Sequence, residues 1–136
     1  AKIRERLSGC VICEQLDGAL NRYAYTIAQL YGTNAEFKQM LDASKGFCLP
    51  HLALVLDMAQ KTLPAAQADA FSKAVAAVEL PNLKRLSDEL EWFTLKYDFR
   101  NADKPWGNSR DAVERSINKL MGACVGDEAK MPAHND

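Results

Sequence analysis

Two short motifs of metal-binding residue types constrain the fold of this chain more than any other feature of its sequence. Cys10 and Cys13 form a C-x2-C pair, and Cys48 and His51 form a C-x2-H pair after an interval of 34 residues. Each spacing directs both side chains toward one centre, and together they supply the Cys3His ligand set of a common structural zinc site. If both pairs bind one ion, the residues between them must lead away from this point and return to it.

A helical hairpin between the two pairs would meet this requirement. Apolar residues recur at steps of three and four over residues 16–30, which predicts an amphipathic helix ending at Gly32. Thr33 and Glu36 predict a capping box for a second helix, which Gly46 closes. Residues 14–31 would rise about 27 Å, residues 34–45 would return about 18 Å, and extended residues 46–48 would add up to about 10 Å. We therefore expect the two pairs to meet at a metal site that joins helix N-termini.

The rest of the chain also has helical periodicity and no alternating run typical of a strand. A third helix is predicted to open at Leu49-Pro50 and to run toward Pro64, with proline tolerated in its first turn. An Ala-rich helix follows over residues 65–78, and Pro81 is predicted to break or kink it. The longest apolar stripe comes next, and an irregular segment over residues 100–107 separates it from a last helix capped by Asn108 or Ser109. The two stripes are Leu83, Leu86, Leu90, Phe93 and Tyr97, and then Val113, Ile117, Leu120 and Cys124.

These features predict an all-α fold, a bundle of five or six helices. The 136 residues and 48% hydrophobic content suit a single domain with its own core, residues 1–136, of which residues 124–136 form a polar tail. The formal net charge is -1, with basic and acidic residues interleaved, so no nucleic-acid surface is expected. We also expect no membrane span and no signal peptide, which favours the cytoplasm, where cysteines serve as metal ligands or free thiols more often than as disulfides.

The metal site allows more than one chemistry. Zinc is the predicted ion, and iron or an iron–sulfur cluster with a histidine ligand is the alternative, although clusters are usually bound by cysteines alone. Cys10 and Cys13 could instead form a redox dithiol at a helix start. That interpretation normally requires a βαβ context, which this sequence lacks.

The irregular segment near residue 100 is a second candidate site, a loop for a ligand or a partner. Its polar and aromatic side chains could line a groove for a peptide or small molecule. The alternative is structural, with the tryptophan plugging the end of the bundle and polar residues capping turns. The candidate residues are Asn101, Asp103, Lys104 and Trp106.

Several segments resemble the motifs of an uncharacterised bacterial family, catalogued only as a domain of unknown function. They include Cys10-Val11-Ile12-Cys13-Glu14, Gly46-Phe47-Cys48-Leu49-Pro50-His51 and Asp103-Lys104-Pro105-Trp106-Gly107-Asn108-Ser109. Longer members carry a similar module upstream, so this chain resembles the C-terminal half or a short form. The resemblance implies metal binding at Cys10, Cys13, Cys48 and His51, and it implies no activity.

Three classes of function follow from these observations. The first is a zinc-stabilised helical module that binds another protein or a second copy of itself, because a four-ligand site leaves no open position for a substrate. The second is a redox or metal sensor that uses the Cys3His set. The third is an enzyme with its site in residues 98–106, which is disfavoured because His134, in the tail, is the only histidine outside the metal set.

Overall fold

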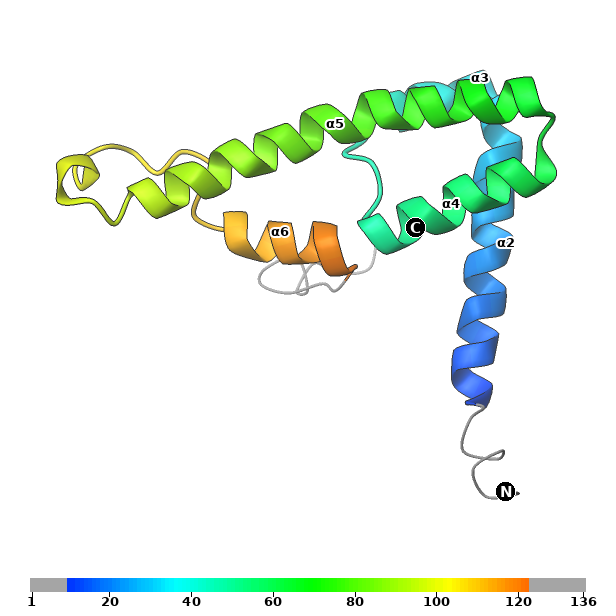
Figure 1. Ribbon diagram of the computed structural model, residues 1–136, viewed down its shortest axis with the longest axis horizontal. Coiled ribbons are helices and arrows are strands. Elements are labelled where there is room, and N and C mark those ends of the chain that lie inside the picture. The colour runs from blue at the N-terminus through cyan, green and yellow to red at the C-terminus, as the bar shows by residue number, and fades with distance from the viewer. Residues whose placement is uncertain (1–9, 123–136) are drawn as a thin grey trace.

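The computed structural model describes residues 10–122, and this part of the chain is helical without a strand. The predicted all-α class is therefore confirmed for these residues, whereas Cys124 and the predicted polar tail lie outside them. The helices, shown in Figure 1, are α2 (Val11–Thr33), α3 (Ala35–Asp42), α4 (Leu49–Thr62), α5 (Ala65–Leu95), the short 3-10 helix η1 (Phe99–Asn101) and α6 (Ala112–Met121).

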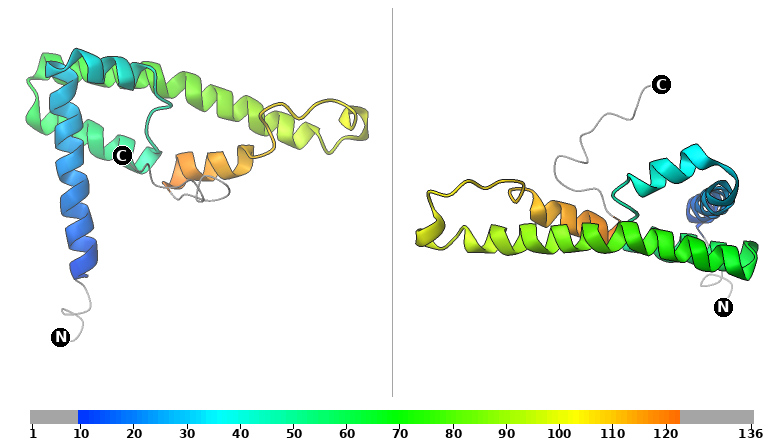
Figure 2. Two further views of the ribbon diagram at one scale, coloured as in Figure 1. Left: turned by 180° about the vertical axis from the view of Figure 1, so that it is seen from behind. Right: turned by 90° about the horizontal axis from the view of Figure 1, so that it is seen from above.

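Helix α5 is the spine of the structure. Helices α3, α4 and α6 each contact it, and α4 makes its most extensive contact with α2. Helix α2 runs roughly perpendicular to α5, and its N-terminal half projects away from the other helices (Figures 1 and 2). The core lies where α2, α3, α4 and α5 meet, and its buried residues are Ala24, Ala28, Leu41, Val55, Ala59, Phe71 and Val75.

The buried residues of α2 lie beside the predicted apolar stripe and not in it. Ala24 and Ala28 are almost fully buried against the core, whereas Leu16 and Tyr23 of the stripe stay 58% and 67% exposed. Leu16 lies in the N-terminal half of α2, which projects away from the other helices, whereas Tyr23 borders a cavity that α2 shares with α4. None of the helices in residues 10–122 has both the length and the apolar character needed to cross a membrane.

Pro81 does not divide the long helix as predicted. Helix α5 continues through it from Ala65 to Leu95, although a proline inside a helix removes one backbone hydrogen bond. Residues on both sides of the proline are buried, including Val78 before it and Leu86 after it. Tertiary packing of one continuous face therefore outweighs the local cost of proline.

The boundary between α2 and α3 also differs from the prediction. Thr33 is not the cap of α3; it ends α2, and its hydroxyl donates to the Gln29 carbonyl. Asn34 is the N-cap instead, and its side chain accepts a hydrogen bond from the Phe37 N–H at 2.9 Å.

The prediction that the apolar stripe of α6 would be its buried face is wrong. Val113, Ile117 and Leu120 are all exposed. The buried face carries Ser116 and Lys119, because Lys119 reaches a buried carboxylate on α5. Neither Asn108 nor Ser109 caps the helix, which begins after Asp111.

Candidate functional site

The Cys–His pair, Cys48 and His51, is already assembled at the start of α4. Cys48 is the N-cap residue in an extended conformation, and Pro50 in the first turn fixes where the helix begins. The Cys48 Sγ and the His51 Nδ1 lie 3.0 Å apart. Two such ligands on one tetrahedral zinc ion would be separated by roughly 3.5 Å, given bond lengths of about 2.3 and 2.0 Å. The pair therefore has the donor chemistry and close to the spacing of half a zinc site.

A buried ion pair holds the loop that carries Cys48. The Glu79 carboxylate, from α5, accepts a hydrogen bond from the Phe47 N–H at 2.5 Å and pairs with the Lys119 ammonium at 2.5 Å. Lys119 also donates to the Lys45 carbonyl at 3.0 Å. Both charged side chains are almost fully buried. The loop is thus tied to α5 and α6 immediately before the first metal-ligand candidate.

Gly46 permits this contact because it has no Cβ. Its φ of +73° is left-handed, and a Cβ built on it would lie 2.2 Å from the Glu79 Oε1. A second glycine approaches Cys48 itself: a Cβ on Gly122, at the end of α6, would lie 3.1 Å from the Cys48 Sγ. The Cys–His pair therefore sits where α4, α5 and α6 converge.

The thiol pair, Cys10 and Cys13, lies at the start of α2, with both side chains exposed. Cys10 is the N-cap, and hydrogen bonds from the backbone N–H and the thiol of Cys13 lower the pKa of Cys10. Donating its thiol hydrogen bond to Cys10 raises the pKa of Cys13. Cys10 is thus the more readily ionised of the two, as expected for a thiol at a helix N-terminus.

The structure brings each pair together but does not bring the pairs to one place. Among residues 10–122 no group of three or more His, Cys, Asp or Glu residues could hold a metal ion. The start of α2 points away from the start of α4 (Figure 1). The expected return fails because the eight residues of α3 run across α2 and not back along it (Figures 1 and 2), so the length of about 34 Å that the 23 residues of α2 span is not retraced. Metal binding by the four residues remains a prediction.

Lys96 organises the loop that carries the second set of candidate site residues. Its ammonium is buried and donates to the carbonyls of Asn101, Ala102 and Lys104 at 2.6–2.8 Å. It also lies 5.2 Å from the centre of the Trp106 ring. Lys96 therefore shapes this loop, although no sequence pattern distinguishes it from the surface lysines.

The four candidate side chains of this loop do not converge on one site. Lys104 donates to the Asn101 side chain at 2.7 Å, and Asp103 is exposed. Trp106 is partly buried and packs on Phe93 at 5.8 Å between ring centres. The loop thus provides internal contacts for three of its four candidates.

Replacing Lys96 with methionine should loosen this loop without unfolding the protein. Three carbonyls would lose their common donor, at a cost of about 1–3 kcal/mol. Amide hydrogen exchange in residues 98–106 should accelerate on the order of tenfold or more. Lys84→Met is the matched control, because Lys84 is an exposed lysine of α5, the helix that ends immediately before Lys96. Equal exchange in the two variants would contradict the organising role of Lys96.

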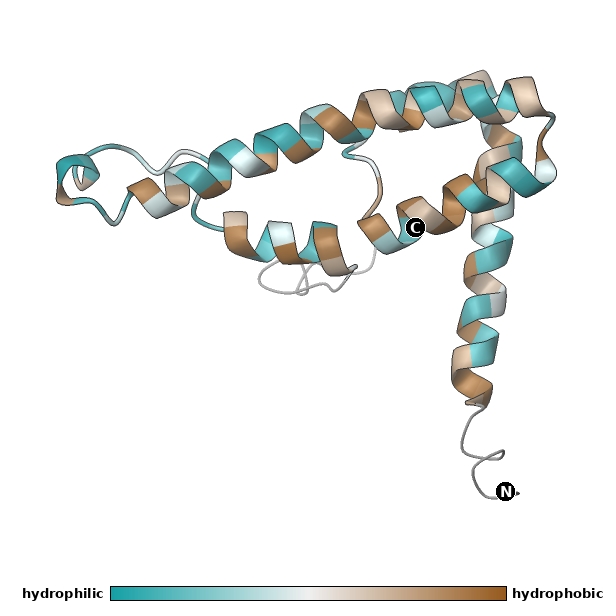
Figure 3. Ribbon diagram, in the orientation of Figure 1, coloured by the Kyte–Doolittle hydropathy of each residue, from teal (hydrophilic) through white to brown (hydrophobic). Residues whose placement is uncertain are grey.

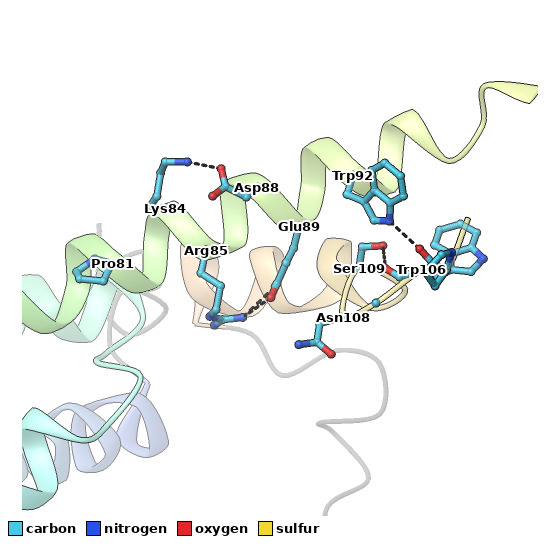
Figure 4. Close-up of a pocket in the computed structure, with 11 residues that line it drawn as sticks. Pro81, Lys84, Arg85, Asp88, Glu89, Trp92, Trp106, Asn108 and Ser109 are labelled. Atoms are coloured by element: carbon cyan, nitrogen blue, oxygen red, sulfur yellow. Dashed lines mark hydrogen bonds and ion pairs between the residues drawn. The ribbon is translucent and has the colours of Figure 1, made fainter. Parts of the chain in front are cut away.

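An open groove of about 570 Å³ lies beside this loop, between it and α5 (Figure 4). Trp92 and Trp106 form one end, and the Trp92 indole N–H donates to the Pro105 carbonyl at 3.1 Å. Glu89 accepts hydrogen bonds from Arg85 along the opposite part of the groove and also pairs with Arg115 of α6. Of the predicted loop residues, only Trp106 lines this groove.

Comparison with known proteins identifies a family and no characterised relative. No curated protein and no solved structure matches the chain. A family model described as "Family of unknown function (DUF6062)" matches residues 1–127, which is nearly the whole sequence. The resemblance to an uncharacterised family is therefore confirmed, and the chain belongs to this family of unknown function, DUF6062.

Proposed function

We propose that this protein is a zinc-stabilised helical interaction module whose ligands are Cys10, Cys13, Cys48 and His51. The observation that supports it best is the assembled Cys–His pair, with Sγ and Nδ1 3.0 Å apart. The exposed thiol pair offers the two remaining ligands with the spacing typical of zinc sites. Zinc bound there would act structurally, because three cysteines and a histidine complete its tetrahedron.

The charged residues at the second candidate site, the loop near residue 100, favour an interaction role over catalysis. The pKa of Asp98 is lowered, chiefly by its hydrogen bond with the Arg100 side chain. A general acid at neutral pH needs the opposite shift. Lys96 is fully engaged with backbone carbonyls. The large exposed hydrophobic residues of α2, by contrast, are typical of a surface that contacts a partner.

The purified protein should contain one zinc ion per chain and be colourless. Cys48→Ser should reduce the zinc content from one per chain to less than a tenth and lower the melting temperature, because structural zinc contributes directly to folding. Elemental analysis and thermal unfolding would measure both effects. Cys124→Ser is the matched control, since it makes the same chemical change outside the four ligands. Equal losses in the two variants would contradict the ligand assignment.

A redox or metal sensor is the second candidate function. It is favoured by the lowered pKa of Cys10, whose exposed thiol lies next to that of Cys13. Mild peroxide should then release zinc and join the two thiols. A visible absorption band in the anaerobic protein would indicate iron instead of zinc. If both thiols resist peroxide and alkylating reagents, the structural role alone remains.

A further inference from the structure

We infer that the zinc joins two copies of this chain, with the thiol pair of one copy and the Cys–His pair of the other binding the same ion. The inference rests on the proposed function, because it takes the same four residues as ligands. It adds a partner, which is a second copy of this chain. A two-fold symmetric dimer would contain two complete Cys3His sites, one on each side of its axis.

The thiol pair and the Cys–His pair are separated within one copy. The thiol pair is at the far end of the projecting half of α2, whereas the Cys–His pair lies where α4 meets the end of α6. The described residues of one copy offer no third ligand to either pair. Each copy therefore carries two complementary half-sites, and a second copy supplies what each of them lacks.

The α2 helix carries an exposed apolar stripe that one copy leaves uncovered by its described residues. Ile12, Leu16 and Tyr23 follow one another on one side of the helix and are 58–69% exposed. Figure 3 shows hydrophobic residues continuing down to the tip of α2. Because no other helix of residues 10–122 lies beside the tip of α2 (Figure 1), the α2 helix of a second copy is the matching cover for this stripe.

An apolar cavity lies next to the Cys–His pair. It has a volume of about 180 Å³ and lies between α2 and the start of α4. His51 forms part of its wall. An arriving Cys-Val-Ile-Cys segment would place an apolar side chain in the cavity and its thiols beside His51. The other lining residues include Leu20, Tyr23, Ile27, Phe47 and Leu54.

The lengths along α2 are consistent with this exchange. If two α2 helices pair antiparallel about a point near residue 17, residue 11 of one copy faces residue 23 of the other. Those residues are about 18 Å apart along one helix, at about 1.5 Å per residue. Each tip therefore reaches the part of α2 that borders the cavity of the other copy.

A mixing experiment tests the shared site with two double variants of the full chain. Cys10→Ser/Cys13→Ser keeps only the Cys–His pair, and Cys48→Ser/His51→Asn keeps only the thiol pair. Each variant alone should lose its zinc, falling from one ion per chain to less than a tenth. Refolded together, they should recover up to half an ion per chain, because each mixed dimer has one complete site.

The outcomes separate this inference from the proposed function. Zinc in the wild type without recovery in the mixture would overturn the shared site and leave the zinc role intact. A wild type that binds no zinc would refute the proposed function itself. Recovery in the mixture would establish ligands from two copies.

A second measurement avoids changing any ligand. With zinc, the wild type should have twice the 15.1 kDa mass of one chain by light scattering, and a chelator should return it to one chain. Leu16→Glu should give a single-chain mass even with zinc. Leu80→Glu, at a similarly exposed leucine of α5, should remain a dimer. A zinc-loaded wild type of single-chain mass, or equal behaviour of the two variants, would overturn the inference.

Discussion

Glu79→Leu should lower the free energy of unfolding by about 3–5 kcal/mol, the cost of removing one partner of a buried ion pair. The Lys119 ammonium would stay buried, with the Lys45 carbonyl as its remaining acceptor among the described residues. The Phe47 N–H would also lose its acceptor. Because small domains are stable by only about 5–15 kcal/mol, this change should remove a large share of the total. Urea unfolding followed by far-ultraviolet circular dichroism would measure it.

Two further variants separate the causes of this loss. Adding Lys119→Met removes the uncompensated charge, so the double variant should recover all but the cost of the two backbone groups left unpaired, the Phe47 N–H and the Lys45 carbonyl, about 1–3 kcal/mol each. Glu91→Leu, at an exposed glutamate of the same helix, should change stability by less than about 0.5 kcal/mol. A double variant as unstable as Glu79→Leu alone would show that the ion pair is not the cause.

Loss of Glu79 should also weaken the proposed metal site. The carboxylate fixes the Phe47 N–H, and Cys48 follows directly. A freer loop must be ordered again when metal binds, so zinc affinity should fall even though no ligand changes. The stability of the fold and the assembly of the Cys–His pair are thus linked through one side chain.

The helices themselves could be predicted because their periodicity is local. The start of α4 is an example: Pro50 predicts a first turn, and the helix begins at Leu49. The continuity of α5 could not be predicted, since proline normally ends a helix and only the packing of residues on both sides preserves it. Local periodicity thus identifies the helices but does not reveal where tertiary contacts override a local preference.

The face that α6 buries depends on a partner that sequence periodicity does not reveal. Val113 and Ile117 form the more apolar side, and the periodicity therefore favoured burying it. The buried carboxylate of Glu79 needs a cation, so α6 turns Lys119 inward instead. One signal was present in the sequence: Glu79 follows Val75 by four residues and so lies on the buried face of α5.

The sequence could predict the two residue pairs of the candidate site, but it could not predict how the pairs lie relative to each other. The x2 spacings fix neighbours within one helical turn, and the Cys48–His51 contact at 3.0 Å agrees with that prediction. The distance between the pairs depends on the lengths and directions of α2 and α3. Packing in the core determines those lengths and directions. Such global geometry is not encoded in the spacing of two motifs.

Gly46→Ala should be nearly as damaging as loss of Glu79, lowering the free energy of unfolding by on the order of 3 kcal/mol or more. The left-handed backbone alone costs an alanine about 1–2 kcal/mol. The added Cβ would also meet the Glu79 Oε1 at 2.2 Å. Glu79 can move away only by losing its contacts with the Phe47 N–H and Lys119. The expected loss is therefore the backbone cost together with about 1–3 kcal/mol, part of the ion-pair cost.

Gly107→Ala is the matched control for the backbone cost, because Gly107 has a φ of +57° and a Cβ added there would meet no atom within 4 Å. Urea unfolding should show Gly46→Ala to be the less stable variant by about 1–3 kcal/mol. In a Glu79→Ala background the two glycine substitutions should cost the same, since the clash is gone and only the backbone strain remains. Equal costs in the wild-type background would show that Glu79 yields freely to the methyl group. In that case the carboxylate would not be what holds Cys48 and His51 in place.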